Sequence, residues 1–367
     1  MEEKIFCSVC GAKLTEETAT EFEGQIFCED CFDEAVTVCD CCGRRIWRSD
    51  ATENDSITLC DSCYDYNYTH CDECGRLIHN DDAFYEDESD YPYCQSCFEK
   101  LQERSIKSYN YKPEPTFYGS GNLFYGIELE IDKGGEYDKN AEVLLSIANE
   151  NSDVLYAKHD GSIDNGFELV SEPATLDYHL NSFNWSDVLE KAVEMGYRSH
   201  NTSTCGLHIH VSRSAFGKTV AEQDDVISRI VYFVEAHWNE LLKFSRRTET
   251  NIMRWASRYG IDNSAKLTYD KAKKNLGRYA AVNLLNFNTI EFRIFRGTLR
   301  YKTFAAALQL VDEVCRLAIM LDDKTFENMS WSDFVLRISR ENKPELIEYL
   351  KSKRLYVNDL TTEAEEM

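Results

Sequence analysis

The first hundred residues contain six CxxC motifs, and their spacing limits the possible fold more than any other feature of the chain. The motifs group in twos into three modules, whose first cysteines lie at positions 7, 39 and 71, a constant step of 32 residues. The first motif of each module reads CxxCG, and an aromatic residue follows the second motif. We therefore predict a threefold internal repeat in this part of the chain.

Each module supplies four thiolates, which is the tetrahedral ligand set of a structural zinc ion. A module of this size buries too little apolar surface to fold alone, so metal binding would provide the folding free energy. Redox-active pairs would not explain the strict grouping in twos, and an iron–sulfur cluster is the other alternative. The predicted zinc ligands are Cys7, Cys10, Cys28, Cys31, Cys39, Cys42, Cys60, Cys63, Cys71, Cys74, Cys94 and Cys97, whereas Cys41 is left over. The modules resemble LIM-type or treble-clef zinc knuckles, without the ligand histidine typical of a LIM signature.

The chain is strongly acidic, with 40 Lys+Arg against 65 Asp+Glu and a net charge of −25. This balance argues against binding to nucleic acid or to an anionic membrane, because both need a basic surface. Residues 1–107 hold 9 Lys+Arg and 26 Asp+Glu, so we expect the modules to dock a protein or to act as a structural cap. No apolar run reaches the length of a membrane span, and MEEKIFCSVC lacks signal-peptide character, so we expect a cytoplasmic protein.

Composition and periodicity divide the chain into four parts. We place three modules (about 5–35, 37–67 and 69–101) in residues 1–104, a linker in 105–122, a main domain in 123–356 and an acidic tail in 357–367. The linker is predicted because this stretch contains two prolines and a Gly-Ser-Gly. In the main domain, predicted strands alternate irregularly with helices, which indicates an α+β fold with an antiparallel sheet. The helical patterns cover residues 140–150, 175–195, 222–245, 303–321 and 330–352.

Charged residues on the predicted strands are the main candidates for a functional site, because residues two apart share one strand face. They are Glu128 and Glu130, Glu168 with Glu172 at the strand end, His208 and His210, and Glu291 and Arg293. For a single strand, the ordinary explanation is a solvated polar face. If the strands are neighbours, crowded carboxylates require a cation, and oxygen ligands with a little imidazole favour Mg²⁺ or Mn²⁺. An arginine beside them would fit phosphate oxygens.

Four ordered motifs within residues 122–322 resemble the amidoligase family: GIELE, HDGSI with FELVSEP, CGLHIHVS and RYAAVNLLNFNTIEFRIFRGTL. These enzymes are carboxylate–amine ligases related to glutamine synthetase and glutamate–cysteine ligase. The resemblance implies a glutamine-synthetase-like catalytic sheet. It also implies a reaction in which ATP phosphorylates a substrate carboxylate and an amine then attacks the acyl phosphate. The implied cofactors are ATP and magnesium or manganese, beside three structural zinc ions.

The resemblance assigns roles to the charged residues of the strands. It makes Glu128, Glu130, Glu168 and Glu291 magnesium ligands and catalytic residues. His208 and Arg293 join the catalytic set, with His208 favoured over His210 at the metal. The resemblance assigns cofactor binding to His210 and Glu172. We expect Arg278 and Arg296 to bind the cofactor as well, as phosphate contacts that no family motif assigns.

Three functions remain open from the sequence. The first is an ATP-dependent ligase that forms an amide or isopeptide bond between a carboxylate substrate and an amine substrate. The zinc modules favour a docked protein or peptide as one substrate of such an enzyme. The second is a zinc-knuckle adaptor on an inactive ligase scaffold, and the third is an ATP-dependent phosphotransferase of the same fold. Neither nucleic acid nor a membrane is expected as a partner.

Overall fold

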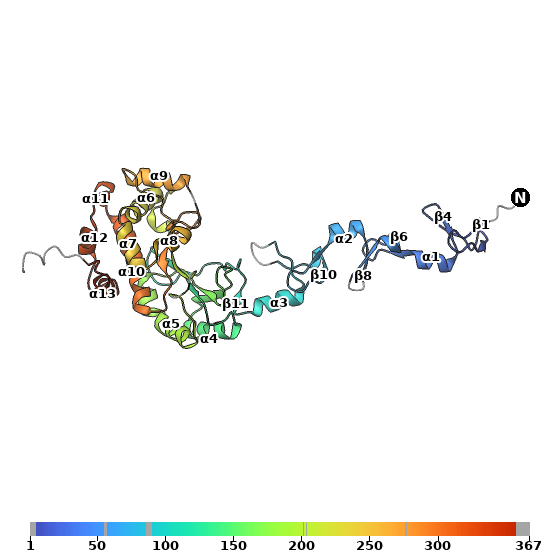
Figure 1. The fold of residues 1–367 in the computed structure, drawn as a ribbon, viewed down its shortest axis with the longest axis horizontal. Helices are drawn as coiled ribbons and strands as arrows, with labels where there is room; N and C mark the ends of the chain where they lie inside the picture. The colour runs from blue at the N-terminus through green and yellow to red at the C-terminus, as the bar shows by residue number, and fades with distance from the viewer. Residues whose placement is uncertain are drawn as a thin grey trace, which may run out of the picture. The chain divides into compact units, whose positions relative to one another are not determined.

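The computed structural model describes residues 5–54, 57–85, 90–200, 202, 204–275 and 277–356 (Figure 1). The chain divides into two compact units, Met1–Glu103 and Arg104–Met367. Helices and strands are mixed in both units. Among the described residues, no helix combines the length and the apolar character needed to cross a membrane.

The N-terminal unit consists of three similar modules with short antiparallel pairings and one α-helix each. The first contains β1 (Ile5–Phe6), β2 (Lys13–Leu14), β3 (Thr20–Phe22), β4 (Gln25–Phe27) and α1 (Glu29–Ala35). The second contains β5 (Val36–Val38), β6 (Arg45–Trp47), η1 (Arg48–Asp50), β7 (Ala51–Asn54), β8 (Ile57–Cys60) and α2 (Asp61–Asn67). The third contains β9 (Tyr68–His70), β10 (Leu77–His79), η2 (Asn80–Asp82) and α3 (Gln95–Glu103). In each module, the first CxxC motif connects the first two strands, and the second motif begins just before the α-helix.

A glycine follows the first CxxC motif of every module because the backbone there is left-handed. Gly11, Gly43 and Gly75 have φ values of 74°, 70° and 71°. A side chain in this conformation would cost roughly 1–2 kcal/mol. The N–H of each glycine donates to the carbonyl of the first cysteine of its motif, at 3.0, 2.8 and 2.8 Å. The CxxCG signature therefore marks a tight turn that fixes the positions of two thiols.

The C-terminal unit is built on a seven-stranded sheet with strand order β11-β13-β14-β12-β15-β17-β16. Neighbouring strands are antiparallel, except that β11 and β13 are parallel. Apolar side chains such as Ile127, Ile209 and Phe292 alternate along the strands and enter one large core. The polar residues between them share the opposite face. The strands are β11 (Ile106–Lys107), β12 (Tyr125–Ile131), β13 (Leu155–Lys158), β14 (Phe167–Ser171), β15 (Gly206–Ser212), β16 (Val282–Asn283) and β17 (Thr289–Arg296).

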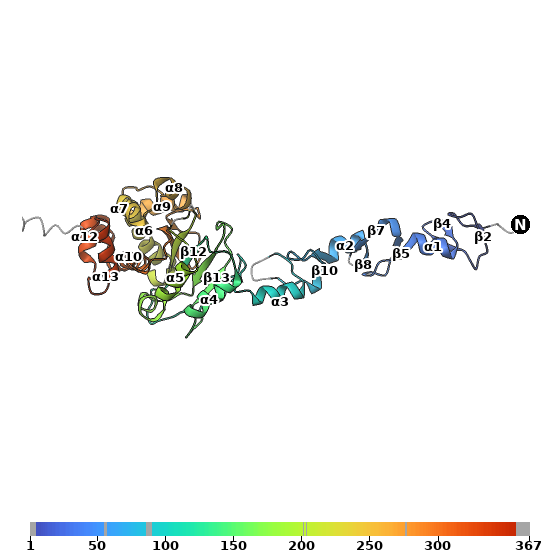
Figure 2. The same ribbon diagram turned by 60° about the horizontal axis from the view of Figure 1, so that its bottom comes forward.

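Helices complete the core of this unit. Helix α4 packs beside α5, and α10 contacts both α6 and α13 (Figures 1 and 2). The helices are α4 (Asp138–Ala148), the π-helical turn η3 (Tyr178–Ser182), α5 (Trp185–Glu194), η4 (Arg213–Phe216), α6 (Val220–Ala236), α7 (Trp238–Ser245), α8 (Glu249–Trp255), α9 (Ala265–Lys274), α10 (Tyr301–Met320), α11 (Asp323–Glu327), α12 (Trp331–Arg337) and α13 (Pro344–Ser352).

Three of the expected helices are each divided in two. The pattern at 175–195 splits into η3 and α5, and that at 330–352 splits into α12 and α13. The pattern at 222–245 is interrupted at His237, whose backbone leaves the helical region and whose Nε2 lies 3.2 Å from the carbonyl of Met329. Tertiary hydrogen bonds therefore override a continuous apolar period.

The structure differs from the expected linker at residues 105–122. Ile106 and Lys107 form β11 of the sheet, and the backbone N–H of Tyr118 donates to the carbonyl of Pro173 at 2.9 Å. The carbonyl of Tyr118 also accepts a hydrogen bond from the N–H of Thr175 at 3.0 Å, so this stretch is attached to the segment after β14. The predicted acidic tail, 357–367, lies outside the described residues.

Candidate functional site

Strand register brings the predicted residues of four strands together on the polar face of the sheet. Strand β12 lies between β14 and β15, and β17 lies beyond β15. Residues directly opposite each other are Glu130 and Glu168, Glu128 and His208, and His210 and Glu291. Cross-strand partners have Cβ atoms about 4.5–5.5 Å apart. Four segments that are distant in the sequence therefore form one cluster of carboxylates and imidazoles.

Two groups within this cluster have the geometry of a metal site. One is Glu128, His208 and Glu291, the other is Glu130, Glu168 and His208, and in each group one ligand atom per residue lies within 4.8 Å of the others. His208 belongs to both: its Nδ1 lies 3.3 Å from an oxygen of Glu128, and its Nε2 lies 3.9 Å from an oxygen of Glu130. Carboxylate oxygens with one imidazole suit Mg²⁺ or Mn²⁺. The donor set therefore fits the divalent ions that the family resemblance implies.

The burial of the carboxylates makes the cluster unfavourable without a cation. Glu130, Glu168 and Glu291 are each at most 4% exposed. Burial raises the pKa of Glu168 well above its ordinary value, and the charge of Glu128 raises it further. Burial also acts to raise the pKa of Glu128, but the two neighbouring histidines outweigh it and hold that pKa well below its usual range. A bound divalent cation would relieve this repulsion.

All of the cluster except Glu130 lines a cavity of about 290 Å³, together with residues that the strand pattern did not single out. Lys158, at the end of β13, places its Nζ 3.6 Å from an oxygen of Glu168. Tyr109, from the expected linker, accepts a hydrogen bond from Arg278 at 3.2 Å. Arg278 was predicted to bind a cofactor, and the structure places it on the cavity lining. The sequence does not mark Lys158 as a site residue, because the strand that carries it is too short for its alternation to show which face Lys158 occupies.

Glu291 and Arg293 form an ion pair inside this cavity. The other carboxylate oxygen of Glu291 accepts hydrogen bonds from the side-chain amides of Asn283 at 2.8 Å and Asn286 at 3.3 Å. Both asparagines lie in the motif AAVNLLNFN, where polar residues among apolar ones were a signal that the sequence reading left unused. Among the described residues, the buried Nε of Arg293 has no hydrogen-bond partner. The guanidinium therefore keeps a donor available for a ligand.

A register shift between β15 and β17 determines where Arg296 lies. With regular pairing Leu207 would face Ile294, but it faces Phe295. The extra residue turns Phe295 into the core and puts Arg296 opposite Gly206, on the polar face. Arg296 therefore shares a face with the cluster, although strict alternation would have put it in the core.

Gly206 leaves space for two neighbouring side chains, those of His208 and Arg247. A Cβ at this position would lie 2.6 Å from Nε2 of His208 and 2.9 Å from Nη2 of Arg247. Its backbone N–H donates to the carboxylate of Glu130. Arg247 is buried, donates to the carbonyl of Phe295 at 3.0 Å, and has an Nε without a partner in the described part of the chain. Burial lowers the pKa of Arg247 to about 10.

Glu172 lies apart from the cluster. It follows the end of β14 and does not line the cavity. One of its carboxylate oxygens accepts a hydrogen bond from the backbone N–H of Thr116 at 2.9 Å. Glu172 lies four residues after Glu168, so a continuous strand would place both on the polar face of the sheet. Strand β14 ends at Ser171, however, and Glu172 therefore leaves that face.

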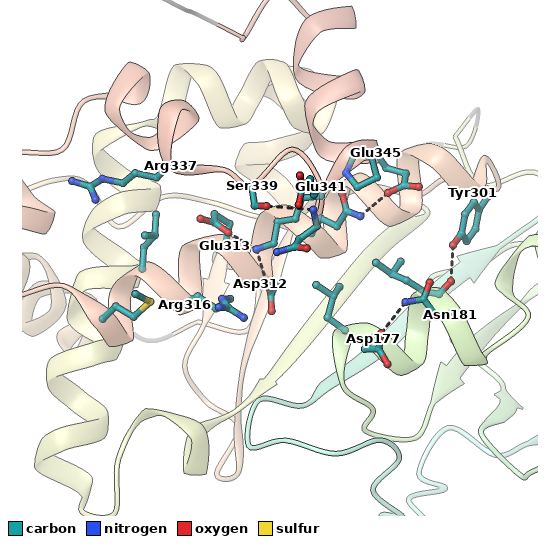
Figure 3. A pocket seen from close by; sticks show the side chains of 18 residues that line it. Asp177, Asn181, Tyr301, Asp312, Glu313, Arg316, Arg337, Ser339, Glu341 and Glu345 are labelled. Atoms are coloured by element: carbon teal, nitrogen blue, oxygen red, sulfur yellow. Dashed lines mark hydrogen bonds and ion pairs between the residues drawn. The ribbon is translucent and has the colours of Figure 1, made fainter.

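Two larger cavities lie elsewhere in the unit. An apolar cleft of about 910 Å³ adjoins the acidic cavity and shares Glu128 and His210 with it. The other, of about 710 Å³, lies along α10, where Asp312 and Glu313 are neighbours (Figure 3). Lys343 pairs with both carboxylates, at 2.5 Å from Asp312, so one buried ammonium group offsets part of the charge of the two carboxylates.

The cysteines of the modules form three clusters of four, as the spacing predicted. Sulfur atoms of the two motifs lie close together, at 3.8 Å for Cys10 and Cys28 and at 3.9 Å for both Cys42 with Cys60 and Cys74 with Cys94. Zinc–sulfur bonds of about 2.3 Å in a tetrahedron place sulfurs about 3.8 Å apart. Backbone hydrogen bonds from Cys10 and Cys28 lower the pKa of Cys7 to about 6, whereas a side-chain hydrogen bond with Cys28 raises the pKa of Cys31, so without metal the thiols of this cluster share protons unequally. The clusters fit zinc knuckles, and Cys41 lies outside them, accepting a hydrogen bond from Asn67.

The fold and the sites define a two-part protein, with zinc-knuckle modules ahead of a unit whose sheet carries a carboxylate-lined cavity. Residues 132–315 match the model of a family described as "putative amidoligase enzyme". This match spans half of the chain, and the chain belongs to that family, which supports a ligase-type function. Glu168, His208, Glu291 and Arg293 lie inside the matched range, whereas Glu128 and Glu130 lie just before it. No curated protein matches the chain.

Proposed function

We propose that the chain is an ATP-dependent carboxylate–amine ligase that forms an amide or isopeptide bond through an acyl phosphate. One observation carries the proposal: two potential metal groups share His208, and all of their members except Glu130 line a cavity that also holds Arg293, Lys158 and Arg278. Phosphoryl transfer depends on positioning and charge neutralisation more than on covalent chemistry by the protein. The cavity supplies both, and family membership makes ligation the expected outcome.

The metal ligands divide between the two groups of the cluster. Glu128 and Glu291 would hold one Mg²⁺, and Glu130 and Glu168 would hold the other. His208 belongs to both groups but would ligate only one ion at a time, because a neutral imidazole has a single acceptor nitrogen. When bound, the ions neutralise phosphate oxygens and so favour attack on the terminal phosphorus. Glu130 also accepts a hydrogen bond from the backbone N–H of Gly206, and this bond keeps the β15 backbone beside the site.

The cationic side chains would bind the transferred phosphoryl group. Arg293 has an unused donor, and Lys158 and Arg278 line the same cavity. In the first step, a carboxylate oxygen of the substrate bonds to the terminal phosphorus of ATP, and ADP leaves. In the second step, the amine nitrogen bonds to the acyl carbon, phosphate leaves with the bonding electrons, and the amine gives up a proton. Exclusion of water protects the acyl phosphate between these steps.

The adjoining apolar cleft would hold an uncharged part of a substrate. Phe117, Phe124 and Phe287 line it, and it meets the acidic cavity at Glu128 and His210. Apolar walls with a few polar groups are typical of ligand sites. The acidic N-terminal unit would in turn dock a protein or peptide substrate that presents a basic surface.

Calorimetric titration of a non-hydrolysable ATP analogue into the zinc-loaded chain tests the proposal. Wild type should bind the analogue only with Mg²⁺ present, and Glu128→Gln should weaken binding at least about tenfold, because it removes one charged ligand. Glu142→Gln, on the exposed face of α4, is the matched control and should bind like wild type. If folded wild type binds no nucleotide, an adaptor function replaces the ligase.

A further inference from the structure

A small cavity of about 160 Å³ outside the acidic site is lined by four cations. They are Arg246, which follows α7, Arg300 and Lys302 at the start of α10, and Lys353 after α13. Three separate segments thus bring positive charge to one point. The chain as a whole carries a net charge of −25, so this concentration of cations runs against its overall composition.

The carboxylates of this cavity do not balance its cations. Glu348 pairs with Lys302 at 3.0 Å, and Glu345 accepts a hydrogen bond from Gln309 at 2.6 Å. Within the described part of the chain, neither Arg246 nor Arg300 has a carboxylate within ion-pair distance. Four cations against two carboxylates leave a local charge of about +2, as counted over the lining residues.

The backbone at Arg246 is a second, independent observation. Arg246 ends α7 in the left-handed conformation, with φ 62° and ψ 15°. Glycine or asparagine usually fills this position, and a residue with a long side chain there costs roughly 1–2 kcal/mol. Such an outlier is a reason to look for a function. Here Arg246 lines the cation-lined cavity and hydrogen-bonds to Tyr349, which also lines it.

Electrostatic repulsion within the cavity favours the binding of an anion. Burial lowers the pKa of Arg246, and the neighbouring Arg296 and Arg300 lower it further. Burial lowers the pKa of Lys353 as well, again with Arg246 and Arg300 adding to the effect. An anion between these groups would remove the repulsion that they exert on one another.

We propose that this cavity binds a phosphate-class dianion, either inorganic phosphate or the phosphoryl group of a small metabolite. The local charge of about +2 matches a dianion, as counted over the lining residues. Two guanidinium groups offer the paired N–H donors that fit phosphate oxygens. The volume lies below the range of about 300–1,000 Å³ of sites for larger organic ligands, so the anion itself fills the cavity.

The position of the cavity links it to the acidic site. Arg246 is followed directly by Arg247, whose Nη2 donates to the carbonyl of Phe295. The same Nη2 occupies the space beside Gly206 that a Cβ would otherwise fill. A phosphate held by Arg246 would therefore fix the backbone that places Arg247 near His208. This coupling rests on the proposed ligase function, in which phosphate is a product, whereas anion binding itself does not.

Phosphate titration by calorimetry tests the assignment. The full zinc-loaded chain is titrated with inorganic phosphate in magnesium-free buffer, where the acidic cavity repels anions. Wild type should bind phosphate, and Arg300→Gln and Lys353→Gln should each weaken binding about tenfold or more. Lys139→Gln, an exposed lysine on α4, removes the same charge elsewhere and should change nothing. Arg293→Gln should also leave this binding unchanged, which separates it from the proposed active site.

Three results would overturn the proposal. The first is no heat of phosphate binding to folded wild type at millimolar concentrations. The second is unchanged binding by both Arg300→Gln and Lys353→Gln, with folding verified by circular dichroism. The third is acetate competing as well as phosphate, which would make the cavity a general carboxylate site. A phenyl phosphate probe that binds as tightly as inorganic phosphate would support a metabolite phosphoryl group as the occupant.

Discussion

The two units of this chain build their sites in opposite ways. In the N-terminal unit, all four ligands of a cluster come from one short stretch, such as Cys39 to Cys63, and the apolar clusters around them are small. In the C-terminal unit, Glu128 and Glu291 of one group lie far apart in the sequence, and one large core supports the sheet that joins them. The first site would create its fold, whereas the second depends on a fold that exists without it.

Metal removal should therefore unfold one unit and leave the other folded, and this is the largest effect that we predict. A chelator that strips zinc should unfold the N-terminal unit, because structural zinc supplies about 10–16 kcal/mol in comparable modules. The C-terminal unit should keep its calorimetric melting transition. Limited proteolysis followed by mass spectrometry would locate the loss, and a protease-resistant N-terminal unit after zinc removal would contradict the account.

A pair of neighbouring cysteines provides a control for that prediction. Cys42→Ser should lower the zinc content from three ions to two, since Cys42 belongs to the second cluster. Cys41→Ser should leave three, because Cys41 lies outside it. Elemental analysis of the purified variants measures both.

The buried ion pairs of Lys343 with Asp312 and Glu313 allow the opposite test, a substitution that should destabilise only the C-terminal unit. Lys343→Met leaves the buried carboxylates of Asp312 and Glu313 without a counter-charge and should cost about 3–5 kcal/mol. Lys191→Met removes an exposed pair with Glu194 and should cost less than about 1 kcal/mol. Urea unfolding followed by tryptophan fluorescence compares them, and equal losses would refute the role given to Lys343.

Acid should destabilise the C-terminal unit through His179, with a somewhat smaller effect. This residue is fully buried, its Nε2 lies 2.9 Å from the carbonyl of Tyr125, and its Nδ1 accepts from Trp185 at 3.2 Å. Burial lowers its pKa from 6.5 to about 4, so the unfolded chain takes up the proton first. The contribution of His179 to the free energy of unfolding is fully present above pH 6.5. It falls by up to about 3 kcal/mol as the pH drops toward 4.

The variant His179→Gln isolates this contribution. Glutamine can replace both hydrogen bonds but does not titrate, so its stability should depend less on pH over that interval. Chemical denaturation at pH 7 and pH 5 measures the difference between the variant and wild type. A pH dependence identical to that of wild type would mean that other groups cause the acid loss.

The contrast between the units also decides how much the sequence could predict. The clusters of four cysteines were predictable because ligand spacing within one stretch fixes their geometry. The strand pairs at Glu128, His208 and Glu291 were visible as residues two apart, but only the family resemblance suggested that their strands are neighbours. Lys158, Asn283 and Arg247 were not singled out, because their places depend on strand order and on the loop after α7.

Non-local contacts explain the remaining differences. The apolar period at 330–352 runs through the break before Lys343, although Pro344 in the first turn of α13 is a local signal for a new helix. The position of Lys343 itself depends on the carboxylates of α10. The position of Arg296 depends on a register shift that strict alternation excludes. The path of residues 105–122 depends on backbone hydrogen bonds to β13 and to the segment after β14.

The most direct test of the central claim is the stoichiometry of Mn²⁺ binding to the zinc-loaded chain, measured by electron paramagnetic resonance. The two groups that share His208 predict two Mn²⁺ ions in wild type and in the Glu142→Gln control. Glu168→Gln and Glu291→Gln should each lose one ion, since each belongs to only one group. Folded wild type that binds no Mn²⁺, or variants that both keep two ions, would contradict the assignment of the cavity as a two-metal site.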